Sequence, residues 1–257
     1  MLVAASSSQS VSLYKVCLTV GFTTKRFLLG RGRFFFAEVP ALDQTIFFLH
    51  YKKMTIKSIA ETSYSGMYKL APEEGSAFYI RREYLPEGLF EKLDTDAEFD
   101  EEESGFLLDA ALTCVVELKA VEYLARAEQS RFGLTRKLTE KKYEKKYIEA
   151  ALTYLEGRGY LSDLRFATAW LNTRRINHFE GRSRLSAELA ARGIAREVAG
   201  QALDEFFSEN DEDEICRKAY EKLSRKKSGD KLTAAMIQSG FSYKQIHQVQ
   251  ESLKENQ

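Results

Sequence analysis

The pattern of apolar and polar positions divides the chain into a strand-like part and a helical part. Short runs of aromatic and β-branched residues recur within residues 11–83, as in SVSLYKVCLTVG, RFFFAEV, TIFFLHYKKM and AFYIRREY. Such runs are typical of β-strands. From about Leu107 to the end the chain holds no proline and is rich in Ala, Leu, Glu, Lys and Arg. That composition and its apolar spacing predict an array of helices.

The boundaries of the strand-like part follow from turn residues and charge. Gly30-Arg31-Gly32 lies between FLL and RFFF, which predicts a hairpin turn. A phosphate-binding loop is the alternative, but the GxGxxG spacing and a following helix are both missing. We expect a flexible tail over residues 1–10 and a β-rich region over 11–93. The acidic run within 94–106 is expected to be a linker, or the solvated start of the next helix.

The helical part contains an internal repeat. Three segments align, starting at Leu134, Leu185 and Leu232, with offsets of 51 and 47 residues. Further coincident positions are Leu138, Leu189 and Met236, then Tyr143, Ile194 and Phe241, then Leu155, Phe206 and Leu253. Glycine precedes two of these residues, as Gly193 and Gly240, where it supplies a left-handed helix end without steric cost. Each unit is therefore predicted to be a long helix, a short helix, a glycine-type turn and another helix.

These units are predicted over residues 107–160, 161–209 and 210–257. Ser162 or Asp163 can cap the helix that starts the second unit. One apolar stripe of that helix, formed by Leu164, Ala167, Trp170 and Leu171, is predicted to face the core. A unit of this size buries little by itself, so stacked neighbours complete its core.

Charge changes this picture because it is unevenly distributed. The chain has no net charge, yet residues 126–196 hold 16 basic and 8 acidic side chains. Such a surplus attracts a polyanion or an acidic protein surface, although solvated helix faces are an equal alternative. The candidate partner-binding residues are Arg126, Arg131, Arg136, Lys137, Arg165, Arg174, Arg175, Arg182 and Arg184.

The sequence offers little that points to catalysis, a metal or a membrane. The three histidines are isolated from one another and from the cysteines, and no P-loop, GxSxG or HExxH motif occurs. The acidic runs DEEES and ENDEDE lack the glycine-centred loop of a calcium site. Cys17, Cys114 and Cys216 are scattered, which predicts reduced thiols in a cytoplasm. No stretch approaches the roughly 18 apolar residues of a membrane helix, and we see no secretory signal.

Two stretches, LARAEQSRFGLTRKL (124–138) and GYLSDLRFATAW (159–170), resemble motifs of the RecX family, the bacterial regulators of the RecA recombinase. The family typically shows L-A-R-R-E-H-S-R-x-E-L-x-x-K-L and then G-Y-L-D-D-x-R-F-A. The matching residues are Glu128, Ser130, Arg131, Leu134, Lys137 and Leu138, then Gly159, Tyr160, Leu161, Asp163, Arg165, Phe166 and Ala167. Gln129, Gly133 and Ser162 depart from it, standing where His, Glu and Asp are usual. The later segments ELAARGI and SGFSYKQI also resemble the family, so the resemblance covers about residues 107–257.

The resemblance implies a mainly α protein: three tandem three-helix repeats, elongated and curved, preceded here by a small antiparallel β region. It implies a monomer without enzymatic activity, metal or cofactor. Such a protein binds the RecA–DNA filament and limits its extension, strand exchange and co-protease activity in recombination, DNA repair and the SOS response. A helix-turn-helix-like regulator that binds single- or double-stranded DNA directly is the alternative, because both share short helix pairs. A purely structural helical scaffold is a third interpretation.

Overall fold

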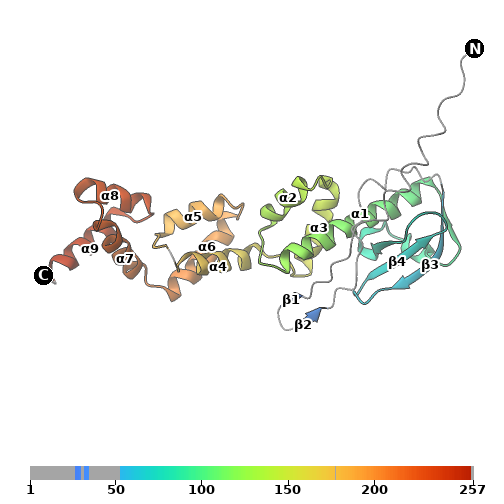
Figure 1. The fold of residues 1–257 in the computed structure, drawn as a ribbon, viewed down its shortest axis with the longest axis horizontal. Helices are drawn as coiled ribbons and strands as arrows, with labels where there is room; N and C mark the ends of the chain where they lie inside the picture. The colour runs from blue at the N-terminus through green and yellow to red at the C-terminus, as the bar shows by residue number, and fades with distance from the viewer. Residues whose placement is uncertain (1–26, 30–31, 35–52, 177, 256–257) are drawn as a thin grey trace, which may run out of the picture. The chain divides into compact units, whose positions relative to one another are not determined.

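The computed structural model describes residues 27–29, 32–34, 53–176 and 178–255 (Figure 1). The chain forms two compact units, Met1–Leu49 and His50–Gln257. In the first unit, strands β1 (Phe27–Leu29) and β2 (Gly32–Phe34) pair antiparallel, with Leu29 opposite Gly32. This pairing agrees with the hairpin expected there. The strand-like runs predicted at 10–21, most of 33–39 and most of 45–54 lie outside the described residues, as does the tail expected over residues 1–10.

The second unit begins with a four-stranded antiparallel sheet. Its strands are β3 (Met54–Glu61), β4 (Met67–Pro72), β5 (Phe78–Arg81) and β6 (Ala97–Phe99), in the order β5-β4-β3-β6. Alternate side chains of these strands form a buried face, which includes Ile56, Leu70, Ile80 and Phe99. The first helix, α1 (Glu101–Leu124), packs against β5 and β6. This helix thus belongs both to the β-rich region and to the helical part.

The acidic run forms strand β6 and the first turn of α1, so of the two expected alternatives the start of a helix is correct and the linker is not. Asp100 caps this helix: its carboxylate accepts a hydrogen bond from the Glu103 backbone N–H at 2.9 Å, and the Glu103 carboxylate accepts one from the Asp100 N–H. The carboxylates at the start of α1 lie at the positive end of the helix dipole, where negative charge is favourable. The acidic composition therefore reflects capping, and the helical part begins at Glu101.

A buried polar cluster joins the sheet to the first repeat. The Nε and Nη2 groups of Arg81 each donate to one carboxylate oxygen of Glu117 on α1, both at 2.6 Å, and the Tyr84 hydroxyl donates to the same carboxylate at 2.8 Å. The Arg81 guanidinium also lies 4.5 Å from the ring centre of Tyr154. Burial, with the Glu117 charge beside it, raises the pKa of Tyr84 far above its ordinary value. Each polar group is thus satisfied inside the protein.

The helices follow in three groups, as the repeat predicts. The first group is α1, α2 (Arg131–Glu140) and α3 (Lys145–Gly157). The second is α4 (Asp163–Arg174), α5 (Arg182–Ala190) and α6 (Arg196–Glu209). The third is α7 (Glu212–Ser224), α8 (Gly229–Gln238) and α9 (Tyr243–Glu255). The expected mainly α fold of three-helix repeats with a small antiparallel β region is confirmed.

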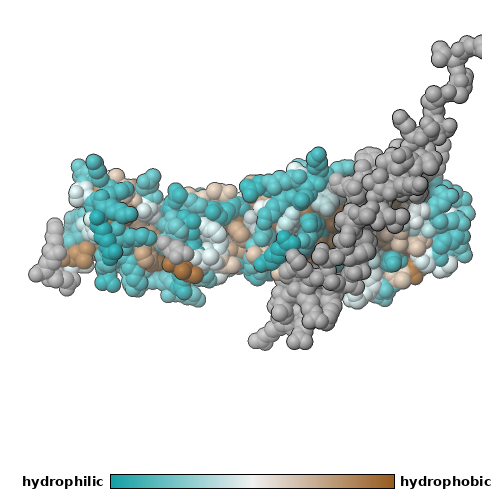
Figure 2. Space-filling model, viewed as in Figure 1, coloured by the Kyte–Doolittle hydropathy of each residue, from teal (hydrophilic) through white to brown (hydrophobic). Residues whose placement is uncertain are grey.

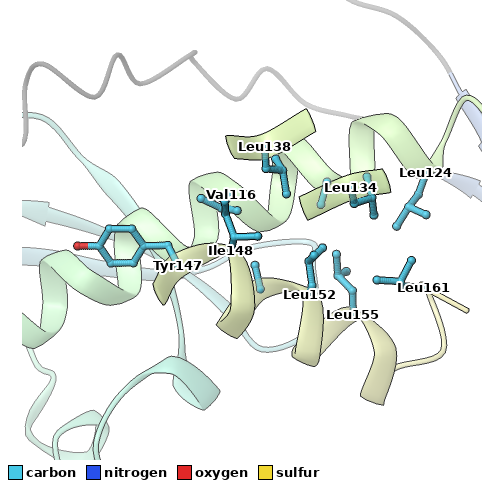
Figure 3. Close-up of a cluster of buried hydrophobic side chains, with 11 residues drawn as sticks. Val116, Leu124, Leu134, Leu138, Tyr147, Ile148, Leu152, Leu155 and Leu161 are labelled. Carbon is cyan, nitrogen blue, oxygen red and sulfur yellow. The ribbon is translucent and has the colours of Figure 1, made fainter. Parts of the chain in front are cut away.

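Each repeat has its own apolar core. In the first, side chains from all three helices converge, among them Val116, Leu134, Ile148 and Leu152 (Figure 3). The aligned leucines of the three repeats, Leu134, Leu185 and Leu232, are all buried in their respective clusters. The surface that Figure 2 shows over the helices is largely hydrophilic, as expected of helices with one buried stripe.

The predicted stripe of α4 is confirmed only in part. Ala167 and Leu171 are buried, whereas Leu164 and Trp170 are partly buried at the edge of the core. The guanidinium of Arg192 lies 4.5 Å from the Trp170 ring centre, and that of Arg174 lies 5.5 Å from it. Two cations over one indole ring keep part of the ring at the surface. Trp170 is therefore an edge residue of the core.

Candidate functional site

The three repeats share one backbone turn between their second and third helices. In each turn the N–H of the apolar residue that closes it reaches back to a carbonyl five residues earlier: Tyr143 to Leu138 at 3.3 Å, Ile194 to Leu189 at 3.2 Å and Phe241 to Met236 at 3.3 Å. The preceding residue has a left-handed backbone in all three, with φ of 65° at Lys142, 76° at Gly193 and 97° at Gly240. This is the Schellman end of a helix, closed by an apolar residue. The repeat seen in the sequence is thus a repeat of this turn.

The turn of the second repeat receives the start of helix α2 from the first repeat. The Ser130 hydroxyl caps α2 by accepting from the Gly133 N–H at 3.0 Å, and it donates to the Arg192 carbonyl, also at 3.0 Å. Phe132 lies over Gly193, where a Cβ atom would come within 2.3 Å of the Phe132 Cβ. Only glycine allows this close approach.

A similar joint recurs between the second and third repeats. The Gly181 N–H, just before α5, donates to the Ser239 carbonyl at 2.9 Å, and the Ser183 hydroxyl donates to the Gly240 carbonyl at 2.9 Å. A Cβ atom on Gly240 would come within 2.5 Å of the Arg184 Cβ. Gly181 occupies the aligned position of Ser130, but it donates through its backbone N–H where Ser130 donates through its hydroxyl, so the two joints are similar and not identical.

The two motifs that carry the sequence resemblance meet at the first of these joints. Asp163, at the start of α4, accepts a hydrogen bond from the Arg131 N–H at 2.8 Å, while Ser162 caps α4 as predicted. Arg165 donates to the Glu128 carboxylate at 2.9 Å and also to the carbonyls of two residues in the preceding loop, Gly159 and Tyr160. Arg165 is exposed, and through these hydrogen bonds it also links the two motifs.

Arg131 and Arg182 occupy aligned positions, and each pairs with a carboxylate on the third helix of its own repeat. Arg131 donates to the Glu149 carboxylate on α3 at 2.6 Å and forms a second ion pair with Glu156. Arg182 pairs with Asp204 on α6 at 2.6 Å. Each arginine therefore ties the second helix of its repeat to the third helix.

A ladder of alternating charges crosses the second repeat. Arg174 forms a bidentate pair with Glu180 at 2.7 and 2.9 Å. Arg184 and Arg192 both pair with Glu188, at 2.6 and 2.7 Å. The hydrogen bond from Arg192, helped by the charge of Arg184, holds the pKa of the Glu188 carboxyl below its ordinary value.

The remaining candidate residues also have partners within the protein. Arg126 pairs with Glu122, Arg136 with Glu140 at 3.8 Å, Lys137 with the Gln129 amide oxygen at 2.7 Å, and Arg175 with Asn210. Arg174 and Arg175 line a cavity of about 310 Å³ between the second and third repeats. The nine predicted residues thus lie over two repeats and do not converge on one site.

Comparison with known proteins assigns the fold to a family. A family model described as RecX, second three-helix domain, matches residues 162–203, within the second repeat. The curated Regulatory protein RecX of Treponema pallidum strain Nichols is 36% identical over 129 residues, which cover 50% of this chain and 79% of the relative. The chain belongs to the RecX family.

Other RecX proteins extend this relationship. The one from Herminiimonas arsenicoxydans is 31% identical over 156 residues, which cover 58% of this chain and 99% of that protein. A crystal structure of the regulatory protein RecX superposes with a TM-score of 0.63 at 20% identity, over 77% of this chain and 99% of the other. The RecX-like fold therefore covers most of the chain.

Residues outside the predicted set stand out in this RecX-family protein. Lys141, Lys142 and Lys145 are exposed at the first Schellman turn, and they have no carboxylate partner within the described part of the chain. The sequence signal for them is the pair of lysine doublets in KKYEKK, residues 141–146. This signal is weak in the sequence alone, because lysine runs are common on solvated helix faces.

The described residues contain no group of histidine, cysteine and carboxylate side chains that could hold a metal. Cys114 and Cys216 are free and buried. Burial raises the pKa of the Cys114 thiol well above its ordinary value and raises the pKa of Cys216 to about 11. Thiols of this kind are poor nucleophiles at neutral pH. Among the described helices, none is long and apolar enough to cross a membrane.

Proposed function

We propose that this RecX-family protein is a non-enzymatic modulator of RecA. In this proposal it binds the RecA–DNA filament in the cytoplasm as a monomer, without a cofactor. It limits the extension of the filament, its strand exchange and its co-protease activity, and so acts in recombination, DNA repair and the SOS response. Support comes from relatives that carry the name regulatory protein.

The observation that carries the proposal is the joint that recurs between the repeats. In both joints a donor just before the second helix of one repeat, the Ser130 hydroxyl or the Gly181 N–H, bonds to an aligned carbonyl in the turn of the next repeat, and a side chain of that helix packs on the turn glycine. Repeats joined in a similar way present equivalent surfaces at regular intervals. A partner that is itself periodic, as a filament is, can then engage several repeats together, which raises affinity without strong single contacts.

The arginines differ in how freely they could contact such a partner. Arg126 and Arg136 expose 54% and 67% of their side chains. Among the described residues, Arg126 pairs only with Glu122 and Arg136 only with Glu140, each four residues away on the same chain. Exposed pairs of this kind are worth little and exchange readily for a partner's carboxylates or phosphates. Arg131 exposes 27% of its side chain and holds two carboxylates. We assign filament contact first to Arg126 and Arg136, then to Arg165, Arg175, Arg182 and Arg184. We assign a largely structural role to Arg131 and Arg174, and also to Lys137, which is partly buried and held by Gln129 and the Tyr123 ring.

Direct sequence-specific DNA reading is less well supported. A reader of base edges needs several Arg, Asn or Gln side chains free at the start of one helix. Here Arg131 and Arg182, at the starts of α2 and α5, are held by carboxylates of their own repeats.

The test is RecA activity. Protein at less than one copy per RecA should lower DNA-dependent ATP hydrolysis and strand exchange by a RecA from the same cell. The matched pair of variants is Gly193→Val, which breaks the first joint, and Gly200→Ala, a helical glycine with open space around it. Gly193→Val should lose most of the inhibition and Gly200→Ala should keep it. An unaffected RecA at equimolar wild-type protein contradicts the proposal.

A further inference from the structure

The first Schellman turn carries a lysine where the other two repeats carry glycine. Lys142 has φ of 65°, a left-handed conformation that residues with a Cβ adopt at a cost in free energy. Its backbone still closes the turn, since the Lys142 N–H donates to the Thr139 carbonyl at 2.8 Å. Gly193 and Gly240 make the same bond to Ala190 and Ile237. The backbone geometry is thus constant, and the lysine side chain is the departure.

Packing explains why the second and third turns carry glycine, but it does not explain why the first turn carries Lys142. Gly193 and Gly240 each receive the preceding repeat, through Phe132 and Arg184. The first repeat has no helical repeat before it, and Lys142 is exposed. Space therefore permits a side chain there, but glycine would still be the less strained residue. A strained residue that persists where an easier one fits points to a function of its side chain.

The charges around Lys142 point the same way. Lys141 and Lys145 are exposed beside it, and none of these three ammonium groups has a carboxylate partner in the described part of the chain. Lys145 and Lys146 stand in the first turn of α3, which holds no acidic residue, and Lys146 pairs with Asp109 at 2.9 Å. Positive charge at that end of a helix is unfavourable. Glu144 is the N-cap of α3, but its side chain makes no capping hydrogen bond. Residues 141–146 thus carry four lysines against one carboxylate, and an anionic partner offsets this surplus of positive charge.

We propose that the turn Lys141–Lys145 binds the phosphate backbone of a nucleic acid. Three ammonium groups within five residues, without a carboxylate partner among the described residues, suit a chain with closely spaced charges. Lysine binds phosphate as a point charge and needs no forked geometry. The site reads no bases, so its binding is independent of sequence. The inference rests on the proposed function in placing DNA beside this protein, and it assigns the contact to residues outside the family motif.

The first test is binding of a fluorescently labelled single-stranded oligonucleotide, without RecA, measured by anisotropy over a range of salt concentrations. The variant Lys141→Gln/Lys142→Gly/Lys145→Gln should bind more weakly. The slope of log affinity against log salt should shrink by about 2, at about 0.7 per phosphate contact on a single strand. The control is Arg225→Gln/Lys226→Gln/Lys227→Gln, which removes the same charge from the exposed segment before α8. An equal loss of DNA affinity in the two variants would show only general electrostatic attraction by the protein, and it would overturn the site.

The single variants separate function from structure. Lys142→Gly should raise the midpoint of thermal unfolding, because glycine relieves the left-handed strain, and it should lower DNA affinity severalfold. Lys142→Arg should keep the affinity of the wild type. Unchanged affinity in Lys142→Gly would refute the assignment. If polyglutamate displaces the labelled oligonucleotide as effectively as unlabelled DNA does, the turn binds an acidic protein and not a nucleic acid.

Failure of this site and failure of the proposed function have different signatures. A wild-type protein that leaves RecA unaffected but binds DNA through the turn contradicts only the proposed function. A triple variant that binds DNA as the wild type does contradicts only the site.

Discussion

Phe132 of the first repeat lies directly over Gly193 of the second, so that a Cβ atom on the glycine would come within 2.3 Å of the Phe132 Cβ. The glycine also holds a left-handed backbone, with φ of 76°. Gly193→Ala therefore meets both a steric overlap and an unfavourable conformation. We expect it to lower the free energy of unfolding by roughly 3 kcal/mol, measured by urea denaturation.

Gly200→Ala is the control for this prediction. Gly200 lies within α6, and a Cβ atom there would meet nothing within 4 Å. Alanine in a helix interior is favoured over glycine by about 0.5–1 kcal/mol, so this variant should be more stable than the wild type. Phe132→Gly removes the Cβ atom that the new methyl group would meet, so in the double variant it should restore part of the stability that Gly193→Ala loses. If the losses of Phe132→Gly and Gly193→Ala simply add, Phe132 is not the residue that the glycine accommodates.

The turns of these joints could be predicted from the sequence, but the contacts that the preceding repeats make with the turn glycines could not. Alignment places Gly193 and Gly240 at matching turns, and the left-handed helix end follows from glycine at that position. Phe132 and Arg184, which lie over these glycines, belong to the preceding repeats. A periodic pattern within one unit carries no signal for how neighbouring units stack.

The candidate arginines show the same limit. Their surplus over acidic residues is visible in the sequence, whereas Arg131 meets Glu149 and Glu156 only because α2 packs beside α3. The Arg81–Glu117 pair, 36 residues apart, likewise has no local signature. Sequence patterns predict the elements and turns well, because those depend on near neighbours along the chain.

The buried Arg81–Glu117 pair yields a second prediction. Both side chains are almost fully buried, with 8% and 3% exposed. Glu117→Gln leaves the guanidinium without its counter-charge in a low-dielectric site, so it should cost about 3–5 kcal/mol in thermal or urea unfolding. Replacing both partners, as Arg81→Met/Glu117→Leu, should cost less than Glu117→Gln alone, since no unpaired charge remains.

The control for this pair is an exposed one in the same sheet. Lys53 and Glu98 expose 59% and 60% of their side chains and pair at 2.5 Å. Glu98→Gln should change stability by less than about 1 kcal/mol, as surface pairs do. A similar loss from Glu98→Gln and Glu117→Gln would show that burial of the latter pair has no special role.

The third prediction concerns stability at alkaline pH. Burial raises the pKa of the Cys216 thiol to about 11, and the nearby Asp213 and Glu212 charges act in the same direction. In the unfolded chain the thiol ionises near its ordinary pKa of about 8.5. As pH rises through this interval, the unfolded state loses its proton while the folded state keeps it. Stability should therefore fall with rising pH, by on the order of 2 kcal/mol from this thiol.

Cys216→Ala isolates that contribution. Tyrosine and lysine side chains titrate in the same way in the wild type and in Cys216→Ala. The difference between the urea midpoints of the two proteins therefore reports the Cys216 thiol. It is measured at about pH 7.5, 9 and 10, which span the range where the unfolded thiol ionises and the folded one does not. The wild type should lose its advantage over the variant as pH rises. If the urea midpoints of the two proteins change in parallel with pH, Cys216 ionises as readily in the folded protein as in the unfolded chain.

The last prediction follows from Trp170, the only tryptophan of the chain. Its ring is partly buried, with the guanidinium groups of Arg192 and Arg174 at 4.5 and 5.5 Å from its centre. Two cations at the exposed edge of the ring attract anions and repel cations. Trp170 fluorescence should therefore be quenched more by iodide than by caesium at equal ionic strength. Arg192→Gln should narrow this difference, whereas Arg217→Gln, which removes the same charge from α7 in the next repeat, should leave it unchanged. Equal and weak quenching by both ions would show that the Trp170 ring lies inside the core. The contacts with Arg192 and Arg174 would then not hold the ring at the edge of its repeat.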